Sequence, residues 1–335
     1  MKLKPFLAAA VAAFSLISCN TDDKATWAPA GDRIMTEWGE NIDPRNVLQE
    51  YPRPQMVRAE WMNLNGLWDY AITAADAVPE KVDGNILVPF AVESALSGVG
   101  RTVTENDALW YEREFVIPES WAGKRVILNF GAVDWKAEVY VDGQPAGEHT
   151  GGYAPFSFDV TDLLGKGRRH ELKVKVTDST DKWFQPRGKQ VSEPGGIWYT
   201  AVTGIWQTVW MEPVAEAHVD SYLAVADIDT GVLNVAVDAD ISNGDICEVV
   251  LLDGETPVAK AEGREVALAV PEMKLWSPSD PFLYGLQIRI IRDGEVIDSI
   301  DGYAAMRKIS YKRGEDGHNR MYLNDEPLFQ YGPLD

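Results

Sequence analysis

The chain has little of the chemistry that binds metals or forms disulfides. Its 335 residues include two cysteines and four histidines. One cysteine, Cys19, lies in an N-terminal leader, which leaves Cys247 without a partner for an internal disulfide. No cluster of histidine and cysteine has the spacing of metal ligands. Apolar neighbours (Ile246, Val249 and Val250) predict that Cys247 is a buried strand residue. We therefore expect neither a metal site nor a cofactor.

Clusters of positive charge are also lacking. The formal net charge is −21, and the densest basic stretch, from Lys166 to Arg169, is a short turn. Proteins that bind nucleic acids neutralise phosphates with clustered lysine and arginine. We therefore expect no nucleic-acid partner. The acidic balance favours solubility and identifies no substrate.

The N-terminal apolar run is too short to span a bilayer. It extends from Phe6 to Ile17 and follows Lys2 and Lys4, as in a secretory signal. It ends in LISC at 16–19, which resembles the lipobox of bacterial lipoproteins, in which the cysteine, here Cys19, carries the lipid. The alternative is a plain signal peptide with an incidental cysteine.

This leader predicts where the protein is located. We expect residues 1–19 to be a lipoprotein signal peptide and the polar residues 20–49 to form a linker. The lipid on Cys19 would be the only contact with a membrane. Export through the inner membrane would then leave a lipid-anchored protein, in the periplasm or at the outer membrane and cell surface.

What the chain does contain is short apolar runs separated by turn residues. They recur at near-regular spacing, for example at 86–88, 113–117, 125–130, 137–141 and 171–176, and few segments have a helical pattern. Three Asp-Gly pairs lie between such runs and favour type I′ hairpins, at Asp142-Gly143, Asp253-Gly254 and Asp293-Gly294. The fold class is therefore predicted to be all-β.

A change in composition near Pro213 divides the chain. Aromatic residues and glycines are dense before this point, and plainer strands follow from His218 to about Arg307. Roughly seven strands in about 95 residues is typical of an immunoglobulin-like sandwich. We expect one β domain over 50–214 and an immunoglobulin-like β-sandwich over 215–309.

Motifs in a fixed order identify the first domain. They are NLNGLWDY at 63–70, LWYER at 109–113, NFGAVDW at 129–135 followed by HTGGYAPF at 149–156, and TGIWQTVW at 203–210. Together they resemble the jelly-roll sugar-binding domain of glycoside hydrolase family 2, whose members are β-galactosidase-like enzymes. The resemblance implies a jelly-roll (galactose-binding-like) β-sandwich.

The rest of the chain continues the resemblance. LWSP at 275–278, PFLY at 281–284 and MRK at 306–308 resemble the immunoglobulin-like domain that follows in this family, although Ala304-Ala305 replace a Phe-Gly pair of many members. YLNDEPLF at 322–329 resembles the hairpin that opens the catalytic (β/α)₈ barrel. Such a barrel needs about 250 residues, so we expect residues 310–335 to be the start of a barrel that is otherwise absent.

The resemblance implies retaining hydrolysis of O-glycosyl bonds by two carboxylates about 5 Å apart. In the family both carboxylates lie on barrel strands, so we expect no catalytic residue here and hydrolysis only with the missing C-terminal barrel. The sequence thus predicts the non-catalytic N-terminal part of a family 2 exo-glycosidase that degrades oligosaccharides or polysaccharides. The alternatives are a complete surface lipoprotein that binds glycans and a structural adhesion or scaffold protein.

Polar and aromatic residues are densest from Asp178 to Tyr199. This stretch has no strand alternation, and its prolines and glycines predict a long ordered loop, which is typically functional. In the family, loops of the first domain reach the terminal sugar, where planar polar groups bind hydroxyls and aromatic faces cover C–H groups. We predict as substrate-binding residues Asp181, Trp183, Gln185, Arg187, Gln190 and Trp198.

Structural roles are the alternative for these residues. Asp181 and Arg187 would then form an ion pair, and Trp198 would pack in the core. The loop also departs from β-galactosidase-like members, which often carry an acidic residue shortly before a Gly-Ile-aromatic segment. Here that neighbourhood reads GIWY at 196–199, with Glu193 further back. The resemblance therefore does not specify galactose as the sugar.

Overall fold

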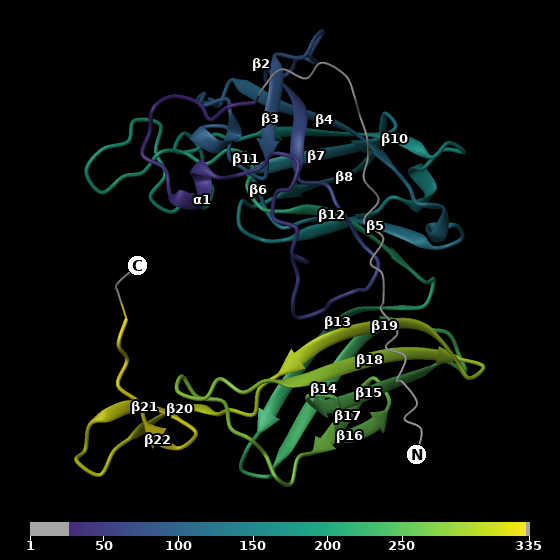
Figure 1. Ribbon diagram of the computed structural model, residues 1–335. Helices are drawn as coiled ribbons and strands as arrows, with labels where there is room; N and C mark the ends of the chain where they lie inside the picture. Colours follow the sequence, from purple (N-terminus) through teal and green to yellow (C-terminus); the bar gives the residue numbers. More distant parts are fainter. Residues whose placement is uncertain (1–26, 333–335) are drawn as a thin grey trace, which may run out of the picture.

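The computed structural model describes residues 27–332, which form two β-sandwiches followed by a small three-stranded sheet (Figure 1). The predicted all-β class is confirmed. The helical segments in this part of the chain have at most four residues, and none is long and apolar enough to cross a membrane. They are α1 (Glu37–Glu40), η1 (Ala95–Ser97), η2 (Glu119–Trp121) and η3 (Thr161–Leu163). The signal peptide over 1–19, its Cys19 and positions 20–26 of the linker lie outside the described residues.

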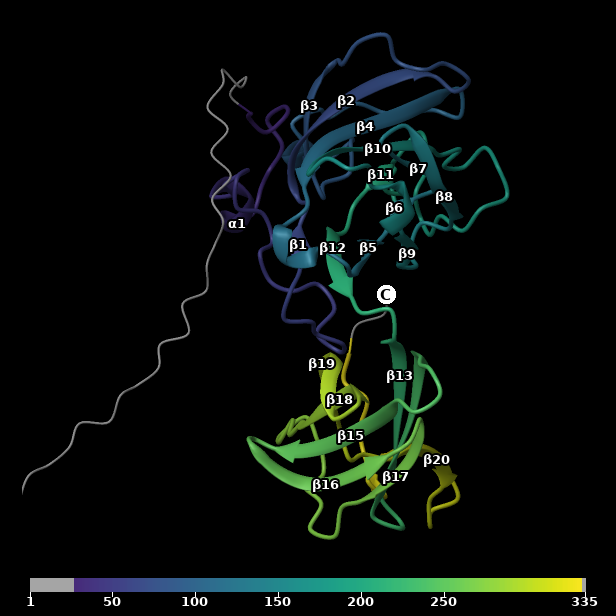
Figure 2. The same ribbon diagram turned by 90° about the vertical axis from the view of Figure 1, so that its right-hand side faces the viewer.

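The first domain is the expected jelly-roll sandwich of two antiparallel sheets, seen as two layers in Figure 2. The larger sheet has the order β3 (Gly84–Val88), β2 (Gly66–Ala74), β4 (Asp107–Val116), β10 (Arg169–Thr177), β7 (Lys136–Val141) and β8 (Gln144–Thr150). The smaller sheet has the order β1 (Met62–Asn63), β12 (Val209–Val214), β5 (Arg125–Phe130) and β9 (Phe156–Asp159). At one end, β6 (Val133–Asp134) pairs with β11 (Gly204–Ile205).

Alternation along the strands builds the core of this domain. In β10, Leu172, Val174 and Val176 are fully buried between more exposed neighbours, because successive side chains of a strand point to opposite faces. Trp68 and Tyr111 meet them from β2 and β4, edge to face, with ring centroids 6.2 Å apart. Burying each such apolar side chain contributes about 1.5–3 kcal/mol.

The second domain is the predicted immunoglobulin-like sandwich. One sheet has the order β13 (His218–Asp227), β14 (Val232–Asp240) and β17 (Glu265–Ala269). The other has the order β16 (Thr256–Glu262), β15 (Ile246–Asp253), β18 (Tyr284–Arg292) and β19 (Glu295–Ala304). Cys247 lies buried in β15, as predicted, and burial raises the pKa of its thiol. A third sheet follows, with β20 (Ile309–Arg313), β21 (Asn319–Leu323) and β22 (Glu326–Pro327).

Two of the three predicted type I′ hairpins have the expected backbone. Asp142-Gly143 and Asp293-Gly294 both have positive φ at the two central positions, as that turn requires. The third differs. Asp253 pairs with Thr256, so that Gly254 and Glu255 form the loop and only Gly254 has positive φ. Glycine at the first central position with positive φ is typical of a type II′ turn.

The segment before β1 connects the two domains. Tyr51 and Arg53 bind the buried carboxylate of Glu212 in the first domain, at 2.7 and 2.5 Å. A few residues later, Val57 forms two backbone hydrogen bonds with Asp301 of β19, and the side chain of Met56 joins the core of the second domain. The N-terminal segment therefore packs against both sandwiches.

Candidate functional site

Residues 178–203 form the long loop between β10 and β11, and a buried aspartate joins its two ends. Asp178 Oδ1 accepts hydrogen bonds from the Thr180 amide (2.7 Å) and from Gln185 Nε2 (2.6 Å). Its other oxygen accepts one from the Thr203 hydroxyl at 2.9 Å. Asp178 and Thr203 are both buried. Because these residues begin and end the segment, Asp178 closes it into one ordered unit, which we call the functional loop.

Gln190 anchors the middle of the functional loop. Its Nε2 lies 3.5 Å from Asp134 Oδ2 in β6 and 3.3 Å from the Tyr153 hydroxyl. Its Oε1 accepts a hydrogen bond of 2.6 Å from the amide of Val202. Both ends of the Gln190 amide are therefore engaged within the protein, as is the Gln185 amide nitrogen on Asp178.

Large apolar side chains of the functional loop point outward. Trp183 is 65% exposed, Phe184 96% and Trp198 43%. Trp183 and Phe184 contact each other edge to face, with centroids 6.1 Å apart. Clusters of exposed aromatic residues on a soluble domain mark binding surfaces, and a flat aromatic face can cover the C–H side of a pyranose. Trp198 therefore does not pack in the core.

Asp181 and Arg187 do not pair with each other. Asp181 accepts a short hydrogen bond from the Ser192 hydroxyl, which lowers the pKa of its carboxyl, and Lys182 Nζ lies 3.7 Å away. The Arg187 side chain makes no hydrogen bond or ion pair with another residue of the described chain. Arg187 therefore keeps all of its donors free for a ligand.

Two more carboxyl groups lie buried behind the functional loop. Glu93 Oε2 accepts a hydrogen bond of 2.9 Å from the Thr203 amide, and Asp134 faces Gln190. The other oxygen of each group, Glu93 Oε1 and Asp134 Oδ1, is buried without a hydrogen-bond partner in the described residues. Burial raises both pKa values to about 7, and the negative charge of Asp178 adds to the effect. Each group is therefore poised to change charge near neutral pH.

Gly152 is required where the chain passes Asp134. A Cβ atom at this position would collide with the Asp134 carboxyl group. The carbonyl of Gly152 accepts a hydrogen bond of 2.7 Å from Trp206 Nε1. The GGY sequence at 151–153 thus lets the chain approach the buried carboxyl closely and places Tyr153 beside Gln190.

All six predicted residues lie in the functional loop, where they have different roles, and the structure adds three residues whose roles the sequence did not reveal. Trp183 and Trp198 are exposed, and Arg187 is half-buried. Gln185 and Gln190 hold the functional loop from within, and Asp181 bonds inside the loop. That any of the six binds sugar stays a prediction. The added residues are Glu93, Asp134 and Asp178, which the sequence analysis named only as the start of the loop. Within residues 27–332, no group of three or more histidine, cysteine or acidic side chains is arranged to hold a metal ion.

Two family models match the chain. The model of the sugar-binding domain of glycosyl hydrolases family 2 matches residues 80–212. A second model, described as glycosyl hydrolases family 2, matches residues 204–307. The two matches join into one stretch that extends over more than half of the chain and includes both sandwiches.

Curated relatives are similar to much of the chain. A β-galactosidase of Thermoanaerobacter pseudethanolicus is 29% identical over 237 residues, which cover 65% of this chain and 30% of that protein. The β-glucuronidase of Sus scrofa is 27% identical over 347 residues, covering 91% of this chain and 52% of that protein. The chain thus spans about half or less of the length of these relatives.

The solved structure of a β-glucuronidase from Ruminococcus gnavus in complex with D-glucuronic acid shares the fold. It superposes with a TM-score of 0.68 at 21% identity, over 84% of this chain and 52% of that one.

Proposed function

Because this chain belongs to glycosyl hydrolases family 2, we propose that it is the sugar-contacting N-terminal part of an exo-glycosidase that degrades oligosaccharides or polysaccharides. The functional loop is the observation that carries this proposal. It presents exposed aromatic side chains and the unpaired guanidinium of Arg187 on a backbone held by hydrogen bonds. Aromatic faces and hydrogen-bond donors together are suited to binding a sugar ring.

The hydrolytic carboxylates would lie elsewhere in the protein. Retaining hydrolysis needs an acid and a nucleophile about 5 Å apart on either side of the glycosidic bond. Glu93 and Asp134 are acidic groups with raised pKa, but both are buried behind the functional loop. We therefore assign catalysis to a (β/α)₈ barrel outside residues 27–332, and the greater length of the relatives supports this.

The residues of the functional loop would divide the work of binding. Trp183 and Trp198 would cover the C–H face of a sugar ring, and Arg187 would donate hydrogen bonds to its oxygens. Gln185 and Gln190 would act as positioning residues, because their amides are already bonded inside the protein. Asp181 would orient Ser192 rather than the sugar.

A first experiment measures the molecular mass of the native protein by immunoblotting with an antibody raised against residues 66–212. The expected band in source cells lies far above the 37.1 kDa of this chain. The immunopurified native protein is then expected to hydrolyse p-nitrophenyl β-D-galactoside or β-D-glucuronide. A band at or below 37.1 kDa without hydrolysis would overturn the proposal and favour a non-catalytic glycan-binding lipoprotein.

A second experiment tests the functional loop in the native protein. Trp183→Ala is expected to raise KM about tenfold or more, as loss of an aromatic contact implies. Trp38→Ala is the matched control, because Trp38 is 80% exposed on α1, outside the functional loop. An unchanged KM for both Trp183→Ala and Trp198→Ala would show that the functional loop does not bind substrate.

We also propose that the protein is anchored by lipid on Cys19 after export. Cells fed a radioactive or alkyne-labelled palmitate are expected to label the native protein but not its Cys19→Ser variant. Protease added to intact cells would then distinguish a periplasmic protein from one on the cell surface. Equal labelling of both forms, or of neither, would refute the anchor.

A further inference from the structure

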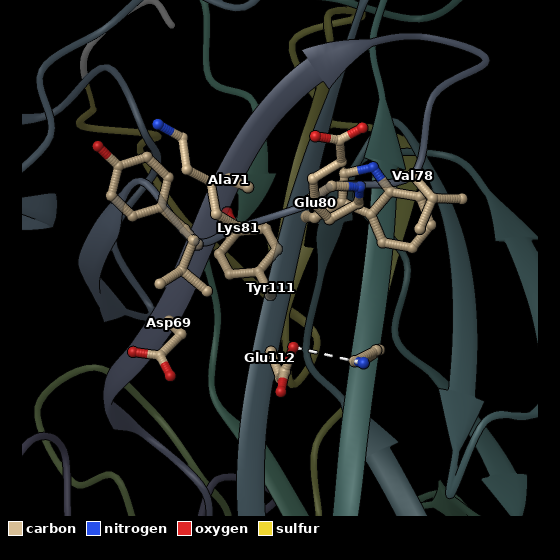
Figure 3. A pocket seen from close by; sticks show the side chains of 12 residues that line it. Asp69, Ala71, Val78, Glu80, Lys81, Tyr111 and Glu112 are labelled. Carbon is tan, nitrogen blue, oxygen red and sulfur yellow. Dashed lines mark ion pairs between the residues drawn. The ribbon is translucent and has the colours of Figure 1, made fainter.

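A hollow lies in the first domain and shares no residue with the functional loop. It has a volume of about 240 Å³ and lies between the larger sheet and the loop over 75–83, which joins β2 to β3 (Figure 3). Strands β2, β4 and β10 supply its floor. The volume is below the roughly 300–1,000 Å³ of pockets for drug-sized ligands, so the hollow suits a unit the size of a sugar ring.

The floor of this hollow is aromatic and fixed in position. Trp110 lies half-buried in β4 beside Ala71 of β2. Its indole N–H donates to the Thr73 hydroxyl at 3.2 Å, and Lys175 Nζ lies 5.8 Å from the ring centroid. Tyr70 adds a second aromatic side chain to the lining. Rigid aromatic rings with few rotatable bonds bind flat apolar faces at low entropic cost.

The loop over 75–83 forms an apolar wall opposite this floor. Val78 is 73% exposed and Val82 51%, and Pro79 lies between them. Figure 3 shows Val78 and Glu80 on one side of the hollow and Asp69 on the other. The wall and the floor thus offer two apolar surfaces to one ligand.

Polar groups without protein partners border the hollow. Glu80 and Lys81 are exposed and form no hydrogen bond or ion pair with another described residue. Glu112 and Lys173 close another side as an ion pair of 3.4 Å. The lining holds three carboxylates, on Asp69, Glu80 and Glu112, and two ammonium groups. This near balance disfavours phosphates and other strong anions and leaves free donors and acceptors for hydroxyl groups.

From these features we infer that the hollow is a second carbohydrate-binding site, which takes a neutral hexopyranosyl unit of a glycan chain. Trp110 and Val78 cover the C–H faces of the ring, and Glu80 and Lys81 bind its hydroxyls. The site would hold a polymer on the larger sheet independently of the functional loop. This inference does not rest on the proposed function.

Affinity electrophoresis of the full chain tests the inference. Native gels contain one soluble neutral polysaccharide each: β-1,4-galactan, xyloglucan, galactomannan or mixed-linkage β-glucan. At least one is expected to retard the chain. Trp110→Ala is expected to weaken the apparent affinity about tenfold, and Glu80→Ala combined with Lys81→Ala keeps the test valid if Trp110→Ala misfolds. Val116→Ala, an exposed change on the same strand, is expected to bind like the native chain.

Each outcome decides for or against the site. Retardation that the lining variants reduce and Trp183→Ala leaves intact supports it. Retardation that Trp183→Ala abolishes and the lining variants leave intact assigns binding to the functional loop and overturns the second site. No retardation in any of the four gels also overturns it.

Discussion

Replacing Glu93 with glutamine is expected to stabilise the first domain at pH 8 and to change little at pH 5. Glu93 lies buried with one oxygen bonded to the Thr203 amide and the other without a described partner. Burial raises the pKa of its carboxyl from 4.5 to about 7. The folded state therefore binds a proton more tightly than the unfolded state between these two values.

The sign and size of the effect follow from this difference. Where the folded state holds more protons, the free energy of unfolding falls as pH rises. The contribution of Glu93 is present at pH values below 4.5 and is lost progressively up to about pH 7. A shift of this size corresponds to about 3 kcal/mol. Glutamine keeps the acceptor for Thr203 and cannot ionise, although its amide N–H₂ needs a partner, so we expect a net gain of about 1–3 kcal/mol at pH 8.

Scanning calorimetry of the native chain and of Glu93→Gln, from pH 5 to pH 8, measures this change in stability through the Tm of each protein. The difference in Tm is expected to grow with pH and to reach several degrees at pH 8. Asp134 titrates in both proteins, so the difference isolates Glu93. Glu105→Gln, an exposed substitution in the same domain, is the control. The reasoning would be refuted by a difference in Tm that is the same at both ends of the pH range.

Three further substitutions test other parts of the structure. Asp178→Ala removes the acceptor that joins both ends of the functional loop. We expect the free energy of unfolding to fall by about 3 kcal/mol and proteolysis within 178–203 to become faster. An unchanged cleavage rate would show that Asp178 does not hold the loop closed. Arg58→Ala leaves Asp298 buried without its ion-pair partner. Unfolding in urea is expected to show that the free energy of unfolding falls by about 3–5 kcal/mol, and the double variant that also carries Asp298→Asn is expected to show a smaller fall. Gly204→Ala places a Cβ atom against the Tyr111 hydroxyl at a backbone φ of 94°. Thermal unfolding is expected to show that the free energy of unfolding falls by more than about 1 kcal/mol. An unchanged Tm would contradict this expectation.

The fold class was predictable because its signals are local. Apolar and polar residues alternate along 169–177, and this region is β10 with four buried side chains on one face. Positive φ at Asp142 and Gly143 follows from the turn chemistry of the Asp-Gly pair. The functional loop was predictable for the same kind of reason, since its prolines and glycines interrupt any strand pattern. Local chemistry was insufficient at Asp253, where a shift in strand register moved the turn by one residue.

The buried carboxyls could not be predicted, because burial of an acid depends on distant segments. Glu93 meets Thr203 across 110 positions and Gln190 meets Asp134 across 56. Glu93 follows Val92 and Asp134 follows Val133, but an apolar neighbour does not indicate that the acid itself is buried. The N-terminal segment is similar, because Arg58 binds Asp298 across 240 positions. Such contacts follow from the tertiary fold rather than from the periodicity of a strand.

The functional loop combines exposed aromatic residues with buried polar residues that hold its backbone in place. If the loop were mobile, a ligand would have to order it on binding, and the entropic cost of this ordering would offset much of the free energy gained from the aromatic contacts. Here Asp178 and Thr203 close the loop and Gln190 fixes its middle, so that ordering is completed during folding. Under the proposed function, substitutions of Trp183 would change the contact with the sugar itself, whereas substitutions of Asp178 would change the order of the loop before the sugar binds. Because the Thr203 amide is bonded to Glu93, the charge of that buried carboxyl acts on the same clamp.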